Sequence, residues 1–106
     1  MKILLDDCIT KKLKSYLKDF EVYTVEMGWS GSKNDELQKN CSLNNFDILL
    51  TIDKNISSQQ NIKRYIISVV VLNSINSKLE SIIPLIPQFK EEISYFKKGH
   101  FYSIDN

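Results

Sequence analysis

The sequence predicts an α/β fold in which a mostly parallel sheet of about five strands carries helices on both faces. Short apolar runs alternate with amphipathic segments, as they do where right-handed crossovers join parallel strands. The 106 residues suffice for one hydrophobic core, so we expect a single domain. Apolar residues form 42% of the chain and charged residues 25%, which is typical of a folded globular protein.

The beginning of the chain predicts two strands with a helix between them. Residues 2–5 (KILL) are a short apolar run bounded by charge, which is typical of a buried strand. Residues 22–25 (VYTV) are β-branched or aromatic and predict a second strand. Between them, apolar side chains recur at helical spacing among lysines and predict an amphipathic helix. The apolar side of this helix comprises Ile9, Leu13, Tyr16, Leu17 and Phe20.

Three further apolar runs predict strands. They are residues 47–51 (DILLT), 66–72 (IISVVVL) and 101–104 (FYSI). The run at 66–72 is the most hydrophobic stretch of the chain. It therefore predicts a central strand that is covered on both faces.

Turn and helix signals fill the connections between these strands. Gly and Ser at residues 28–32 (GWSGS) predict a loop. Ser32 is placed to cap a helix that continues to residues 41–44. A short helix or turn is expected over 57–64.

The longest helix is predicted between the fourth and fifth strands. Ser77 followed by Glu80 predicts a capping box at its start. Pro84 and Pro87 must kink the helix or divide it in two, because proline lacks an N–H and clashes with the preceding turn. The apolar side comprises Leu79, Ile82, Ile83, Ile86, Phe89, Ile93 and Phe96.

The composition excludes several classes of function. No apolar run reaches the roughly 18 residues that a membrane span needs, and the apolar run Ile3–Leu5 is too short for a signal peptide. We therefore expect a cytoplasmic protein. Cys8 and Cys41 are expected to be reduced core residues, and one histidine is too few for a typical zinc site. The net charge of +1 predicts no large basic field.

Acidic residues follow two of the predicted strands. Asp6 and Asp7 come directly after the first strand, Asp53 follows the third, and Glu36 lies in the first turn of the helix between the second and third strands. Ligands of open parallel sheets bind at the carboxyl ends of the strands. If the two strands are neighbours, the carboxylates approach one another and either share protons or hold a cation. Oxygen ligands favour Mg²⁺ or Mn²⁺. The alternative is structural, since acids after strands are often helix N-caps.

Residues in segments beside this acidic edge are candidates for contacting a phosphate backbone. Lys33, Lys54, Lys63 and Arg64 carry suitable charge, or are simply solvated surface residues. Trp29, in the predicted glycine–serine loop, either stacks on a base or covers the core.

Several segments of the chain resemble one family in register over nearly the whole length. The chain resembles the compact bacterial PIN-like family of predicted nucleases, whose members usually read LLDE, GWSG before a Glu-Leu pair, T-x-D-x-N at a strand end, QQN and VVL. The segments that carry the resemblance are KILLDD, GWSGSKNDEL, FDILLTIDKN, QQN and ISVVVLNSINSKLESIIPLIP.

The resemblance implies a metal-dependent ribonuclease. In the wider PIN superfamily, acids at these positions bind Mg²⁺ or Mn²⁺ and cut RNA. Those roles fall on Asp6, Glu36 and Asp53, with Asp7 nearby in place of the usual Glu. PIN domains of this size resemble the toxin half of toxin–antitoxin pairs, which implies an antitoxin protein as partner and a homodimer.

The resemblance also singles out a group of amides after the third strand. Asn55 stands where many PIN nucleases carry a fourth acid, so we expect weaker metal binding, because an amide brings no charge. The amides either hydrogen-bond phosphate, sugar or metal-bound water, or brace a loop. They are Asn55, Gln59, Gln60 and Asn61.

Two alternatives remain open from the sequence. One is a catalytically weak or inactive PIN-like module that binds an antitoxin or RNA without cutting it. The other is a receiver domain of two-component signalling, which also carries paired acids after its first strand and an Asp after its third. A receiver needs a Lys after its last strand, and the tail HFYSIDN has none.

Overall fold

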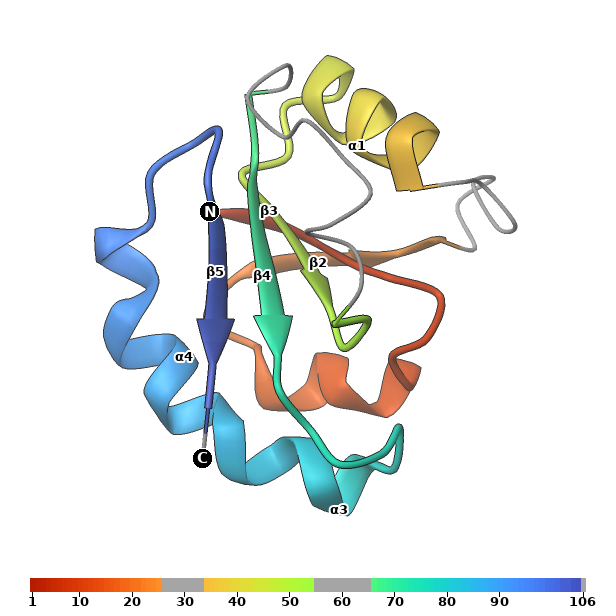
Figure 1. The fold of residues 1–106 in the computed structure, drawn as a ribbon, viewed down its shortest axis with the longest axis vertical. Coiled ribbons are helices and arrows are strands. Elements are labelled where there is room, and N and C mark those ends of the chain that lie inside the picture. The colour runs from red at the N-terminus through yellow and green to blue at the C-terminus, as the bar shows by residue number, and fades with distance from the viewer. Residues whose placement is uncertain (26–33, 55–65, 106) are drawn as a thin grey trace.

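A five-stranded parallel sheet lies at the centre of the computed structural model, which describes residues 1–25, 34–54 and 66–105 (Figure 1). The predicted fold class is confirmed, and every strand pair of the sheet is parallel. The strand order is β2-β1-β3-β4-β5. The strands are β1 (Lys2–Leu5), β2 (Glu21–Thr24), β3 (Ile48–Thr51), β4 (Ser68–Leu72) and β5 (Phe101–Ile104).

This strand order places a topological switch point between β1 and β3. The chain leaves β1 toward β2 on one side, whereas it leaves β3 toward β4 on the other. β1 and β3 pair in register from Ile3 with Ile48 to Leu5 with Leu50, so the two strands end side by side. In doubly wound sheets, the crevice beyond such a switch point is where ligands bind.

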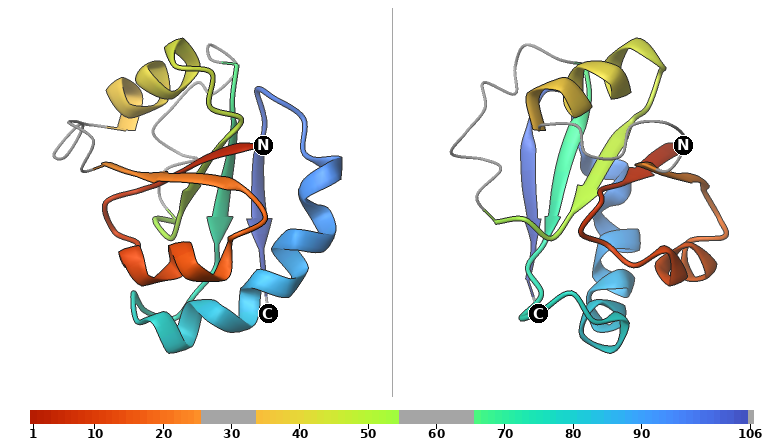
Figure 2. Two further views of the ribbon diagram at one scale, coloured as in Figure 1. Left: turned by 180° about the vertical axis from the view of Figure 1, so that it is seen from behind. Right: turned by 90° about the vertical axis from the view of Figure 1, so that its right-hand side faces the viewer.

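Helical elements cover the two faces of the sheet (Figures 1 and 2). Helix α1 packs on one face through Leu37 and Cys41, and the other helical elements pack on the opposite face. The helical elements on both faces together are η1 (Lys11–Tyr16), α1 (Asn34–Leu43), α3 (Leu79–Ile82), η4 (Ile83–Leu85), α4 (Ile86–Glu92) and η5 (Ile93–Tyr95).

The strands are buried on both sides because helices flank the sheet. In β1, Ile3 and Leu5 join one core and Leu4 joins the other. All of β4 is buried, which confirms its prediction as a central strand. The strand begins at Ser68, however, two residues after the predicted start; of the two residues before it, Ile66 is 67% exposed and Ile67 is buried. The third strand likewise begins at Ile48, one residue after the predicted start.

The first helix differs from its prediction. It is a 3₁₀ helix of six residues, in which Leu13 is buried and Thr10 accepts a hydrogen bond from the backbone N–H of Lys12. Tyr16 was expected in the core, but the helix ends there and 42% of the side chain is exposed. Cys8 was also expected in the core; it lies in the exposed turn before the helix, whereas Cys41 is buried.

The later helix begins without the predicted capping box. Helix α3 starts at Leu79, and its N-cap residue Lys78 makes no side-chain capping bond. The Asn76 carboxamide oxygen instead accepts the Lys78 N–H at 2.9 Å, so the Asn76 turn replaces the role expected of Ser77. The predicted division by prolines is confirmed, since η4 and α4 each have a proline in their first two positions.

Three sequence predictions fall outside the described residues. They are the loop at 28–32, the Ser32 cap and the short helix over 57–64. Among the helices that the structure describes, none is long and apolar enough to cross a membrane.

Candidate metal centre

Asp6 and Asp53 lie at the carboxyl edge of the sheet, just beyond the adjacent strands β1 and β3. The backbone N–H of Asp6 donates to the carbonyl of Leu50 at 2.9 Å, which extends the β1–β3 ladder by one residue. Asp6 is therefore held at a defined position next to Thr51, the last residue of β3. The sequence left the order of the strands open, and the pairing of β1 with β3 meets the condition under which the two aspartates approach each other.

The Thr51 hydroxyl links the two aspartates. The O–H group donates to Asp6 Oδ2 at 2.7 Å, and its oxygen accepts a hydrogen bond from the backbone N–H of Asp53 at 3.0 Å. The Thr51 side chain is fully buried, so these bonds are shielded from competing water. One buried hydroxyl thus orients the Asp6 carboxylate and also positions the backbone that carries Asp53.

Asp6 is bonded by neutral donors on both carboxylate oxygens. Oδ1 accepts the backbone N–H of Asp7 at 2.7 Å, and the Cys8 thiol lies 3.6 Å from Oδ2 and 3.4 Å from the Thr51 hydroxyl. In the described part of the chain, no Lys or Arg forms an ion pair with Asp6. Neutral donors orient a carboxylate without cancelling its charge, so Asp6 retains its attraction for a cation.

The negative charge of Asp6 extends its influence to the inner face of α1. Burial raises the pKa of the Cys41 thiol to about 12, and the Asp6 charge adds to that rise. Burial also raises the pKa of the Cys8 thiol, again with a contribution from Asp6. Helix α1 is therefore within electrostatic reach of the carboxyl edge.

Helix α1 carries two polar residues that bear on this site, Glu36 and Gln38. Glu36, in its first turn, has an exposed side chain. Gln38 is fully buried, and neither polar atom of its amide has a hydrogen-bond partner among the described residues. An unsatisfied buried amide costs about 1–3 kcal/mol, so a water molecule or a ligand atom would be a favourable partner here.

The structure brings together only part of the predicted ligand set. Asp6 and Asp53 are both hydrogen-bonded to the Thr51 hydroxyl, whereas Asp7 is exposed beside Asp6. Within residues 1–25, 34–54 and 66–105, no three His, Cys, Asp or Glu residues group closely enough to hold a metal ion, so Glu36 does not join the two aspartates. The aspartates and the hydroxyl are hard oxygen donors, which suit Mg²⁺ or Mn²⁺ with water completing the coordination.

A small cavity opens beside Asp6 at the ends of β1 and β2. Its volume is about 90 Å³, which leaves room for water around a bound ion. Its lining includes acidic, basic and apolar side chains: Leu5, Asp6, Asp7, Ile9, Lys11, Thr24 and Val25.

Only one of the predicted substrate-binding residues lies in a described segment. Lys54 is exposed and lines a cavity of about 320 Å³, together with Val71, Asn73, Phe101 and Ser103 among others. The remaining candidates lie outside the described residues. They are Trp29, Lys33, Asn55, Gln59, Gln60, Asn61, Lys63 and Arg64.

Thr51 and Cys8 were not predicted as site residues. The available signal for Thr51 was a hydroxyl at a strand end, two residues before an aspartate. Such a hydroxyl can bond a neighbouring carboxylate only if the two strands are adjacent, and adjacency could not be read from the sequence.

The chain was compared with known proteins at three levels. It matches no protein-family model, no curated protein and no solved structure.

Proposed function

We propose that this protein is a metal-dependent ribonuclease that hydrolyses RNA phosphodiester bonds at its carboxyl edge. The observation that carries the proposal is the pair of aspartates at the switch point, tied together by the buried Thr51 hydroxyl. Asp6 and Asp53 would hold Mg²⁺ or Mn²⁺, and water would complete the coordination of the ion.

Each residue of the edge has a distinct role in this proposal. The metal would activate a water molecule and stabilise negative charge on the phosphodiester. Asp6 would bind through a carboxylate that Thr51 already orients, and Asp53 would contribute the second negative ligand. Lys54, the exposed residue after Asp53, would hold a phosphate oxygen of the RNA.

We expect weak activity that a partner restrains. Weakness follows because Asn55 adds no fourth charge and the net charge of the chain is only +1. The antitoxin partner and the homodimer follow from the toxin resemblance alone.

The test compares wild type, Asp53→Asn and an empty vector in a bacterial host. The same proteins are incubated with a labelled single-stranded RNA in Mn²⁺ or in chelator. Growth arrest and Mn²⁺-dependent cleavage that both disappear in Asp53→Asn would support the nuclease. Arrest that persists in the variant, without cleavage by either protein, would favour a binding module.

One observation favours a second candidate. The order β2-β1-β3-β4-β5 is also that of receiver domains, which transfer a phosphoryl group to an Asp at the same edge. Against this reading, β5 is followed by Asp105 and Asn106 rather than by a lysine. Incubation with acetyl phosphate and Mg²⁺ separates the two: a phosphorylated Asp53 detected by mass spectrometry would establish the receiver.

A further inference from the structure

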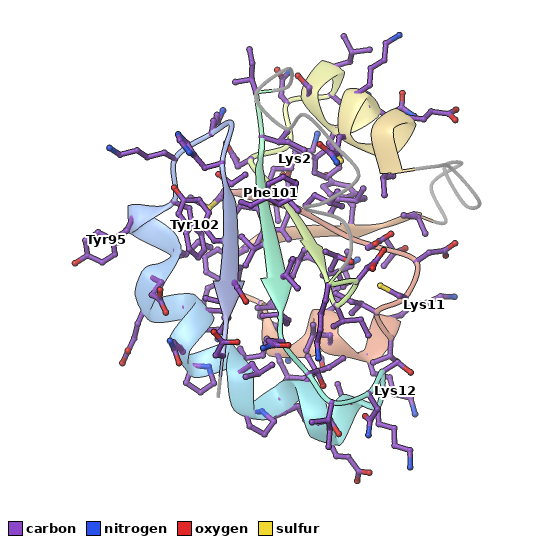
Figure 3. The ribbon with its side chains drawn as sticks, in the orientation of Figure 1. Lys2, Lys11, Lys12, Tyr95, Phe101 and Tyr102 are labelled. Atoms are coloured by element: carbon purple, nitrogen blue, oxygen red, sulfur yellow. The ribbon has the colours of Figure 1, made fainter. Side chains whose placement is uncertain are left out.

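A run of lysines follows the acidic edge directly. Between Asp7 and Asp19 the chain contains no acidic residue. The same stretch presents four lysines, all of them exposed: Lys11, Lys12, Lys14 and Lys18. We call these four side chains the lysine ridge. Figure 3 shows Lys11 and Lys12 extending outward from the beginning of η1.

The geometry of η1 explains why the ridge faces solvent. Residues three apart lie on the same side of a 3₁₀ helix, so Lys14 stands one turn beyond Lys11 on one row. Leu13 and Leu17, both fully buried, anchor the segment to the core. The apolar contacts therefore fix the orientation that leaves the lysines outside.

Three lysines of the ridge are not paired with acids in the described part of the chain. Among the described residues, none forms an ion pair with Lys12, Lys14 or Lys18. Asp19, the next acid along the chain, lies 3.6 Å from Lys90 on α4. Exposed ammonium groups that lack an ion-pair partner, as these three do, are the electrostatic arrangement that binds phosphates.

Two cavities lie along this segment. Helix η1 runs antiparallel to β2, the edge strand of the sheet, as the left view of Figure 2 shows. The 90 Å³ cavity at the carboxyl end of β2 contains Lys11 together with Asp6 and Asp7. The second cavity has a volume of about 390 Å³ and is lined by Lys14, Ser15, Leu17, Lys18, Phe20 and Val22. The ridge thus connects the acidic edge to a larger hollow near the beginning of β2.

The larger hollow has the chemistry of a nucleotide site. Lys14 and Lys18 supply charge, while the partly exposed ring of Phe20 supplies most of the apolar surface, beside the nearly buried Val22. Single-stranded RNA is commonly held in this way, with a base against an apolar or aromatic surface and its phosphates on lysines. An acidic protein segment fits the hollow less well than RNA does. Its carboxylates would pair with the lysines, but it would place no planar base against the apolar surface.

We infer that the lysine ridge carries the RNA strand away from the acidic edge and seats one nucleotide in the hollow between Lys14 and Lys18. This inference rests on the proposed ribonuclease function and names the path that its substrate takes. It also gives a nearly neutral protein a local means of binding RNA.

The test measures binding in chelator, where metal-dependent cleavage cannot occur. Anisotropy of a labelled oligouridylate is followed from about 50 to about 200 mM salt for wild type, Lys14→Gln/Lys18→Gln and a control. The control, Lys39→Gln/Lys97→Gln, removes the same charge from exposed lysines on α1 and after η5. We expect the ridge variant to bind about tenfold more weakly and its salt slope to fall by about 1.4, and we expect the control to change less than about twofold.

Three results would overturn the inference. They are equal losses in the ridge variant and the control, unchanged RNA binding by the ridge variant, and a polyglutamate peptide that displaces the RNA at equal concentration. Cleavage assays in Mn²⁺ separate this inference from the proposed function. If the protein cleaves RNA but binds it equally well without the ridge lysines, the proposed nuclease function stands and the inference about the ridge is wrong. If RNA binding depends on the ridge lysines but no cleavage occurs, the inference about the ridge stands and the proposed nuclease function is wrong.

Discussion

Two aspartates at opposite edges of the sheet are treated differently by the rest of the molecule. Asp47, before β3 at the amino edge, accepts the backbone N–H of Lys2 at 2.8 Å and pairs with Lys98 at 3.3 Å. Asp6, at the carboxyl edge, is bonded by a hydroxyl, an amide and a thiol. Partial burial alone would raise the pKa of Asp47, but the Lys2 amide and Lys98 outweigh it and lower that pKa.

The difference separates a structural acid from a candidate ligand. Lys98 compensates the charge of Asp47, which leaves little for another cation to gain. The donors to Asp6 fix the carboxylate in one orientation and leave its charge uncompensated within the described residues. Asp6 is therefore oriented and charged as a ligand for a cation should be, whereas Asp47 is not. The following predictions test this difference between the two aspartates.

The largest expected effect is on metal binding by Asp6→Asn. Loss of a charged ligand should weaken Mn²⁺ binding by more than about 100-fold, since even the loss of a residue that hydrogen-bonds a metal ligand costs about 10–100-fold. Asp47→Asn, the matched control, should leave Mn²⁺ affinity unchanged. Calorimetric titration of both variants measures the effect. Unchanged Mn²⁺ affinity in both Asp6→Asn and Asp53→Asn would show that the site assignment is wrong.

Removal of the linking hydroxyl should have the next largest effect. Thr51→Val keeps the shape of the side chain but takes away the donor to Asp6 and the acceptor of the Asp53 amide. Mn²⁺ affinity should fall about tenfold. The free energy of unfolding should drop by about 1–3 kcal/mol, because polar groups lose buried partners. Thr51→Ser restores the hydroxyl and should recover most of the Mn²⁺ affinity, which a purely steric role would not produce.

Replacement of Asp47 at the amino edge should have a smaller effect, on the free energy of unfolding, and this effect should depend on pH. The folded-state pKa of Asp47 is lowered, so its charge stabilises the fold above its unfolded pKa of about 3.9 and loses that contribution as the pH falls through the folded value. Asp47→Asn should therefore lower the free energy of unfolding by about 0.5–1 kcal/mol at neutral pH, after screening by solvent. Urea unfolding should show the two proteins converging as the pH falls below the lowered pKa of folded Asp47. A difference that persists there would assign the effect to hydrogen bonding.

The smallest effect is predicted for Lys98→Gln. The Lys98 side chain is 51% exposed, so its ion pair with Asp47 should contribute no more than about 0.5 kcal/mol. Urea unfolding in low and high salt measures this contribution, which should vanish in high salt. A loss above about 1 kcal/mol would mean that Asp47 depends on Lys98 more than on the Lys2 amide.

The sequence predicted the five strands well because burial on both faces demands uninterrupted apolar runs. β4, whose five residues are all buried, is the clearest case. The helices were predicted less accurately, since hydrophobic spacing does not distinguish a 3₁₀ turn from an α-helix in a segment as short as Lys11–Tyr16. Capping failed at Ser77 because a nearby amide, Asn76, made the competing turn.

The candidate site was predicted in outline and incompletely in detail. Strand-end position sufficed to place Asp6 and Asp53 on one edge. The sequence does not specify where the first turn of α1 lies relative to the strand ends, so it could not show that Glu36 stays apart from the two aspartates. The role of Thr51 depended on strand order, which apolar runs of similar composition leave undetermined.

The pairing of β1 with β3 also has a consequence for the order of events during synthesis. Asp6 and Thr51 are 45 residues apart in the chain, and the strands that carry them have no hairpin to bring them together. A nascent chain therefore holds Asp6 loosely until β3 has emerged from the ribosome and docked. Contacts between such distant residues form slowly. In that interval Ile3, Leu4 and Leu5 lack their neighbour on one side, so a chain halted before residue 48 is a candidate for aggregation or for chaperone binding.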